Sequence, residues 1–91
     1  MKVTLTSYVA EFVGTFFFLL SILASAGSPL VIGGALALVV FLIAGLSGGH
    51  VNPAVSFMMY LNGGLRPSEL AGYIVSQLAG GAAALYAFNR L

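Results

Sequence analysis

The sequence predicts an all-α membrane protein with three transmembrane helices and one shorter, re-entrant half-helix. Of its 91 residues, 60% are hydrophobic and only 5% are charged, whereas soluble domains carry about 25% charged residues. The apolar residues also gather in three long segments, at residues 7–26, 29–46 and 67–88. A helix of roughly 20 residues crosses a hydrocarbon core of about 30 Å. Each segment is therefore interpreted as one membrane span.

The composition also excludes several classes of function. The formal net charge of +1 arises from three basic and two acidic residues, too few for a surface that binds nucleic acid. The chain has no cysteine and one histidine, so it offers neither a disulfide framework nor a metal site. No group of residues suits catalysis, and the Gly-Gly pairs do not form a phosphate-binding pattern. We expect a multi-pass protein of the cell membrane without enzymatic activity or a cofactor.

The first apolar segment, residues 7–26, carries an acidic residue near its start. Because a carboxylate exposed to lipid is costly, Glu11 is a candidate functional residue; snorkelling to the interface is the alternative. Lys2, the apolar run 12–23 and the small residues 24–26 also resemble a secretory signal with its cleavage site. The position of Glu11 at the edge of that run favours a transmembrane helix instead, as does the equal hydrophobicity of the remaining chain.

The second and third segments have clear boundaries. The tight connection SAGSPL, residues 25–30, predicts that the first two helices form an antiparallel hairpin. Pro67 suits the first turn of the third helix, and Glu69 places a carboxylate where the helix dipole favours it. Small side chains recur every four residues along this helix and let another backbone approach closely. Gln77, mid-way along this helix, could hydrogen-bond another helix, although packing is the favoured interpretation for it as for Gly72, Ser76, Gly80 and Ala84.

Residues 47–61, SGGHVNPAVSFMMYL, interrupt the apolar sequence. Asn52 followed by Pro53 is a strong helix start, because asparagine caps free N–H groups and proline fits the first turn. The ten residues 52–61 give about 15 Å of helix, half a bilayer. Irregular backbone at membrane depth is tolerated where it is buried in protein or lines a water-filled cavity. We therefore expect a loop that enters the membrane and a half-helix that returns; a capped helix lying at the interface is the alternative.

Three motifs follow one another along the chain: AEFVGTF at residues 10–16, SGGHVNPAVSF at 47–57 and YIVSQLAGGAAA at 73–84. Together they resemble the N-terminal half of an aquaporin or aquaglyceroporin, the major intrinsic protein family. The resemblance covers nearly the whole chain and implies a single half-aquaporin domain at residues 1–91. Family members contain two such halves, inverted relative to each other, whose half-helices meet at the centre of a narrow pore. The chain would thus be one inverted repeat of the aquaporin fold.

The resemblance also implies roles for single residues. Asn52 would donate its side-chain amide to water in mid-pore, while Pro53 and Ala54 hold the facing loops together. Glu11 matches the family glutamate that braces this loop from behind. The half-helix N-termini, each with about half a positive charge, would orient water and oppose cations and proton hopping. The backbone carbonyls expected to form a ladder of acceptors are those of Gly48, Gly49, His50 and Val51.

The selectivity filter departs from the family pattern. Family members usually place an arginine shortly after the second Asn-Pro-Ala, and the matching residue here is Val55. The helical filter positions would fall on Ile32 and, from an inverted partner, on Val40. With Gly49, these residues would line two equivalent apolar mouths that carry no fixed positive charge. We therefore expect a path that admits glycerol-like and other small neutral solutes.

One half alone cannot enclose a pore, so the resemblance requires a second half. Either two identical chains pair in opposite orientations, or a separate chain supplies the other half. In the family orientation Lys2 and Arg66 would be cytoplasmic and Arg90 would lie outside, a bias too weak to fix one orientation. We expect an inverted homodimer embedded in the lipid bilayer, with a tetramer of pores as a further assembly.

The main prediction is a passive channel for water and small neutral solutes. One alternative is a small dual-topology exporter in which Glu11 carries a proton, and dependence of flux on a proton gradient would distinguish it. The other alternative is a non-conducting half that needs a separate second-half chain, which failure of the chain to self-associate would favour.

Overall fold

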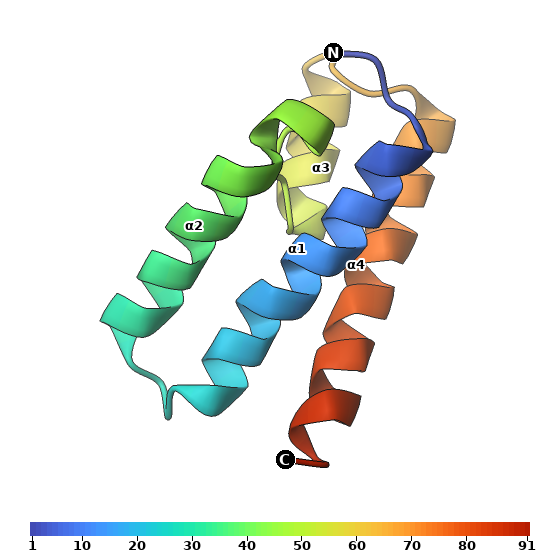
Figure 1. Cartoon of the computed structure of the whole chain (residues 1–91). Coiled ribbons are helices and arrows are strands. Elements are labelled where there is room, and N and C mark those ends of the chain that lie inside the picture. Colours follow the sequence, from blue (N-terminus) through green and yellow to red (C-terminus); the bar gives the residue numbers. More distant parts are fainter.

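The computed structural model describes residues 1–91 and consists of four helices joined by short connections (Figure 1). The helices are α1 at Leu5–Ala24, α2 at Pro29–Ser47, α3 at Pro53–Leu61 and α4 at Pro67–Phe88. Three of them, α1, α2 and α4, are long and apolar enough to cross a membrane, whereas α3 has only 9 residues. The prediction of an all-helical protein with three candidate spans is confirmed.

Most helix ends follow from local sequence. The Ser28 hydroxyl accepts a hydrogen bond from the Val31 N–H at the start of α2, and the Asn52 side chain accepts one from Ala54 at the start of α3. These caps satisfy N–H groups that have no partner inside a helix. At the end of α2, Gly48 has a φ of +91°, a left-handed conformation that favours glycine and stops a helix.

The first helix differs from the predicted range. It was expected at residues 7–26, yet α1 begins at Leu5 and ends at Ala24. Ala26 and Gly27 both have positive φ angles, 54° and 81°, which a right-handed helix excludes. The turn into α2 therefore begins within the apolar run, where hydrophobicity alone gives no boundary. The second range extends one residue further than expected, to Ser47, and α4 has its predicted bounds.

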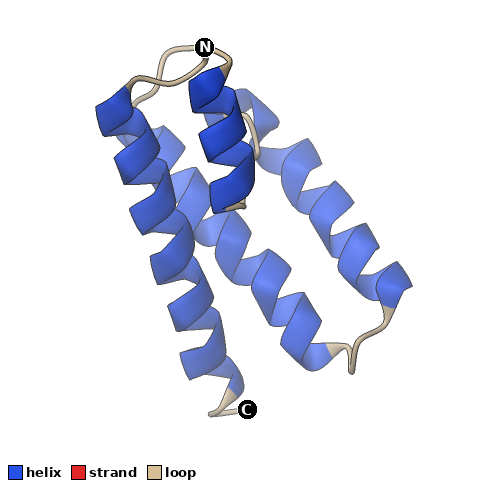
Figure 2. Ribbon diagram, turned by 180° about the vertical axis from the view of Figure 1, so that it is seen from behind, coloured by secondary structure: helices blue, strands red, loops and turns tan.

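Helix α1 lies at the centre of the packing, with α2 on one side and α4 on the other, while α3 packs against α4 (Figures 1 and 2). Glycines allow the close approaches. A Cβ atom at Gly80 of α4 would lie 2.6 Å from the Phe12 carbonyl oxygen, and one at Gly14 of α1 would lie 2.7 Å from Cδ1 of Ile43 in α2. Side chains at either position would push the helices apart.

The short helix α3 runs beside the first part of α4, and its N-terminal end lies part-way along the longer helices (Figure 2). The chain termini lie at opposite ends of the bundle. Unusually, the most deeply buried side chains are mainly polar, and they gather around the end of α2 and the start of α3. These buried polar residues are Ser7, Glu11, Thr15, Ser47, Ser56 and Gln77.

Candidate functional site at the α2–α3 connection

The connection from Gly48 to Asn52 has an unusual backbone. Gly48 and Gly49 have φ angles of +91° and +67°, and Val51 has a φ of +44°. A β-branched residue rarely adopts a positive φ, and such a conformation costs about 1–3 kcal/mol. It persists only where the surrounding structure holds it.

The Glu11 carboxylate is the group that holds this backbone. Its Oε1 accepts the Val51 N–H at 2.7 Å, and its Oε2 accepts the His50 N–H at 3.0 Å. Two side chains complete its environment: Ser47 Oγ donates to Oε2 at 2.7 Å, and Gln77 Nε2 donates to Oε1 at 2.9 Å. Glu11 is fully buried, and its four hydrogen bonds offset the loss of water around the charge.

A second chain of hydrogen bonds begins at Gln77. Its Nε2 also donates to Ser56 Oγ at 2.8 Å, and Ser56 Oγ lies 2.9 Å from His50 Nδ1. Burial lowers the pKa of the His50 imidazole, and the nearby Glu11 charge raises it by a smaller amount, which favours the neutral ring. The network thus links α1 and α4 to the connection and to α3.

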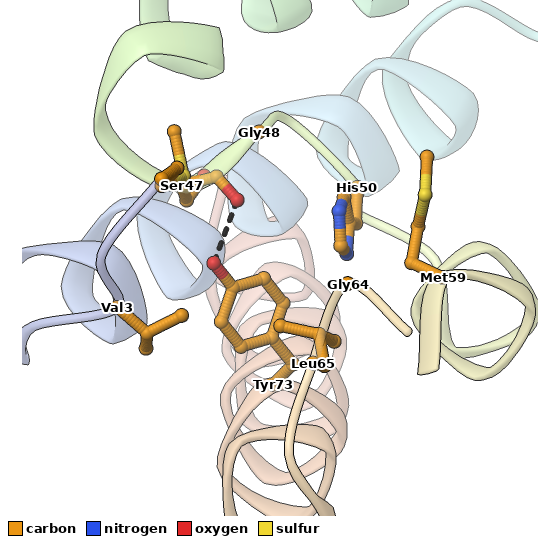
Figure 3. A pocket seen from close by; sticks show the side chains of 9 residues that line it. Val3, Ser47, Gly48, His50, Met59, Gly64, Leu65 and Tyr73 are labelled. Carbon is orange, nitrogen blue, oxygen red and sulfur yellow. Dashed lines mark hydrogen bonds between the residues drawn. The ribbon is translucent and has the colours of Figure 1, made fainter. Parts of the chain in front are cut away.

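The carbonyls at the end of α2 are also satisfied by side chains. Tyr73 Oη donates to the Ser47 carbonyl at 2.6 Å (Figure 3), and Ser7 Oγ donates to the Leu46 carbonyl at 2.8 Å. Sequence reasoning assigned no role to Ser7, Ser47, Ser56 or Tyr73. The available signal was hydroxyl groups inside apolar segments, which must find partners when they are buried.

Several polar groups near the connection have no partner within the chain, among them the buried side-chain oxygens Gln77 Oε1 and Thr15 Oγ1. No hydrogen bond within the chain reaches the carbonyl oxygens of residues 48–51. The Asn52 Oδ1 accepts the Ala54 N–H at 2.8 Å, which leaves the Nδ2 donors without a partner on an exposed side chain. The connection therefore presents a row of acceptors followed by one amide donor.

The other residues expected near a pore are distributed as follows. A Cβ at Gly49 would lie 3.3 Å from the Val40 Cα, so the structure brings Val40 directly against the connection. Ile32 lies on the same helix about 12 Å away along its axis, and nothing within the chain brings it to Val40. In the first turn of α3, Pro53 and Val55 are half-buried and Ala54 is exposed.

The expected packing residues of α4 lie at different depths. Gly72 faces the Tyr8 ring, and Gly80 faces the α1 backbone at Phe12. Ala84 is buried and Ser76 is half-buried. Gln77 belongs to the polar network rather than to an apolar seam. No three histidine, cysteine or acidic side chains gather in a way that could hold a metal ion.

Comparison with known proteins agrees with this geometry. The family model described as Major intrinsic protein matches residues 2–90. The chain belongs to the major intrinsic protein family. Members of this family are multi-pass membrane channels rather than enzymes, and the three long apolar helices of this major intrinsic protein agree with that placement.

Several curated relatives are similar to this major intrinsic protein. Glycerol uptake facilitator protein-like 6 from Lactiplantibacillus plantarum is 36% identical over 80% of the chain and 38% of its own length. Propanediol uptake facilitator PduF from Salmonella typhimurium is 39% identical, over 78% and 32%. Aquaporin PIP1-1 from Arabidopsis thaliana is 35% identical, over 79% and 31%. The chain thus spans about a third of the length of these relatives. No solved structure gives a significant match.

Proposed function

We propose that this chain forms one half of a membrane channel for water and small neutral solutes such as glycerol. The observation that carries the proposal is the connection braced by Glu11, which leaves the carbonyls of residues 48–51 and the Asn52 amide without partners in the chain. In this proposal the connection is a re-entrant loop, and α3 is the half-helix that returns to the same side. The free groups then replace the hydrogen bonds that a permeating molecule loses on leaving water.

The electrostatics of the site favour neutral solutes. The only acidic group near the connection, Glu11, is buried and fully hydrogen-bonded. The N-terminal end of α3 contributes about half a positive charge beside Asn52. A cation at this point meets the positive helix end without an accessible carboxylate, whereas a neutral hydroxyl can accept from Asn52 and donate to a carbonyl.

The second half of the pore is, in this proposal, a copy of the chain in the inverted orientation. Asn52 and Ala54 are exposed at the tip of α3, where the facing half-helix would meet them. The filter at each mouth is then formed by Ile32, Val40, Gly49 and Val55. Since these side chains are apolar or absent, the mouth carries no charge and suits the carbon backbone of a small polyol. Two relatives are named as facilitators of glycerol and propanediol uptake, and these names support this class of solute.

Proton-coupled export through Glu11 receives less support from the geometry. A proton carrier needs access to water, yet Glu11 is fully buried and accepts four hydrogen bonds that protonation would disturb. The two functions are separated by measuring flux with and without a proton gradient. Passive conduction is independent of the gradient, and a gradient-driven flux would contradict the channel.

The direct test is stopped-flow light scattering on liposomes that contain only the purified chain. After an osmotic shock with an impermeant solute, we expect faster shrinkage than in empty liposomes. Ala54→Trp should abolish the excess rate by filling the proposed pore centre. Ala71→Trp is the matched control, because Ala71 is also exposed but lies on α4 away from the connection. Folded wild-type protein with the permeability of empty liposomes would overturn the proposal for identical chains.

The inverted pairing has its own test, which the absence of cysteine makes simple. Lys2→Cys and Arg90→Cys each add one thiol near one end of the bundle. In sealed vesicles, dual insertion predicts that an impermeant thiol reagent labels about half of each variant, because identical chains enter in both orientations. Complete labelling of one variant and none of the other would show a single orientation and would direct the search to a separate second half.

A further inference from the structure

The His50 ring separates the polar network from a cavity at the N-terminal end of the bundle. The cavity has a volume of about 210 Å³ and lies beneath the N-terminal segment and the α3–α4 connection. His50, Gly48 and Tyr73 line it together with the apolar side chains of Val3, Met59 and Leu65 (Figure 3). One ring nitrogen, Nδ1, lies 2.9 Å from Ser56 Oγ. The proton on the other nitrogen decides what the cavity can bind.

Counting donors and acceptors determines where that proton lies. The Glu11 carboxylate accepts hydrogen bonds and has none to donate, so the Gln77 atom 2.9 Å from it must be the amide nitrogen. The second hydrogen of this nitrogen goes to Ser56 Oγ at 2.8 Å. Ser56 is fully buried, and the only acceptor within reach of its own hydrogen is His50 Nδ1. Ser56 therefore donates to Nδ1, which must carry no proton.

A neutral imidazole without a proton on Nδ1 carries it on Nε2. Nε2 lies toward Gly48, because a Cβ atom at Gly48 would be 3.1 Å from it. The other hydroxyl donors that line the cavity are already used, since Tyr73 Oη donates to the Ser47 carbonyl and Ser47 Oγ to Glu11. The Nε2–H group is thus the free side-chain donor of the cavity.

We propose that Ser56 positions the proton of His50 on Nε2, and that this N–H binds the oxygen of a water or alcohol hydroxyl in the cavity. Gly48 also lines the cavity, and its carbonyl has no hydrogen-bond partner within the chain. A ligand that accepts from Nε2 and donates to a carbonyl satisfies both groups, and a hydroxyl does so. The choice of a water or alcohol as occupant rests on the proposed function. The position of the proton rests on the hydrogen-bond network alone.

The position of the proton is testable by nitrogen NMR of the full chain in lipid vesicles, grown with ¹⁵N-labelled histidine. His50 is the only histidine, so both ring resonances are assigned without mutagenesis. At pH 8, above the ordinary imidazole pKa of about 6.5, we expect a protonated Nε2 and an unprotonated Nδ1. Ser56→Thr keeps the hydroxyl and should keep this pattern, whereas Ser56→Ala should give a mixture of both tautomers. A wild-type Nδ1–H, or an unchanged pattern in Ser56→Ala, would overturn the proposal.

The occupant is identified in the same samples. Exchange or cross-relaxation between Nε2–H and water, unaltered by glycerol, identifies water as the ligand. A saturable shift of the Nε2 resonance on adding glycerol identifies an alcohol hydroxyl. An Nε2–H that contacts neither would overturn the binding site. These measurements do not depend on solute flux. A chain that does not conduct, but whose Nε2–H contacts a hydroxyl, would contradict the proposed channel and leave the proposed binding site intact.

Discussion

The Glu11 carboxylate on α1 lies 2.7 Å from the backbone nitrogen of Val51, a residue 40 positions later whose φ is +44°. This contact joins a strained backbone to a buried negative charge. Hydrogen bonds to a charged group contribute about 1.5–3 kcal/mol each, comparable to the cost of the strained conformation. The same contact turns the loop N–H groups inward and leaves the loop carbonyls free.

The first prediction concerns this carboxylate. Glu11→Gln keeps the size of the side chain but turns one acceptor into a donor that faces other donors. We expect a loss of about 1–3 kcal/mol for each N–H or hydroxyl left without an acceptor, measured as the free energy of unfolding in detergent micelles. The control is Glu69→Gln, because Glu69 pairs with the exposed Arg66. This variant should lose less stability, since water can replace the contacts of the Glu69 carboxylate. Equal losses in both variants would contradict the bracing role.

The second prediction compares two glycines within helices. Gly80→Ala places a Cβ 2.6 Å from the Phe12 carbonyl oxygen and should destabilise the α1–α4 packing by about 1–3 kcal/mol. The Cβ added by Gly33→Ala would have no atom of the chain within 4 Å, so this variant should stabilise α2 by about 0.5–1 kcal/mol. Thermal unfolding of both variants in the same detergent checks the opposite signs. If Gly80→Ala melted at or above the wild-type temperature, the close helix contact would be wrong.

The third prediction concerns solute preference. Val55→Arg introduces a long, charged side chain at the proposed mouth, where it narrows the path and adds hydrogen-bond donors. We expect glycerol permeability to fall more than water permeability in liposomes. Val55→Leu, which adds volume without charge, should reduce both to a similar and smaller extent. An unchanged glycerol-to-water ratio in Val55→Arg would place Val55 away from the conduction path.

The fourth prediction is a pH dependence that arises from His50. Its pKa is lowered in the folded chain because burial disfavours the charged ring, against a smaller raising effect of Glu11. The unfolded chain therefore takes up a proton first, and stability falls as the pH drops through about 6.5. The loss of stability levels off once the pH is below the pKa of His50 in the folded chain. His50→Asn, which retains an acceptor for Ser56 and does not titrate, should lack this step in unfolding measurements between pH 8 and 5. If the variant showed the same fall in stability, the pH dependence would arise from a group other than His50.

Much of the fold was determined by the sequence itself. The apolar segments at 29–46 and 67–88 differ from α2 and α4 by at most one residue, because membrane length and composition act on each helix separately. Asn52 and Pro53 start α3 through local capping. The first segment was misplaced by two residues, since its end depends on the φ angles of Ala26 and Gly27 and not on hydrophobicity.

Only the tertiary structure decided how the polar groups meet. Ser47 and Gln77 reach the Glu11 carboxylate across 36 and 66 residues of sequence, and Ser56 is placed between Gln77 and His50. Sequence reasoning singled out Glu11 as a costly charge and Gln77 as a packing residue able to hydrogen-bond another helix, but it could not show that the two share a hydrogen bond. Spacing along a chain indicates which residues share a helix face. Which donor satisfies which buried acceptor depends on how α1, α3 and α4 pack, and the packing is set by contacts such as that of Gly80 with Phe12.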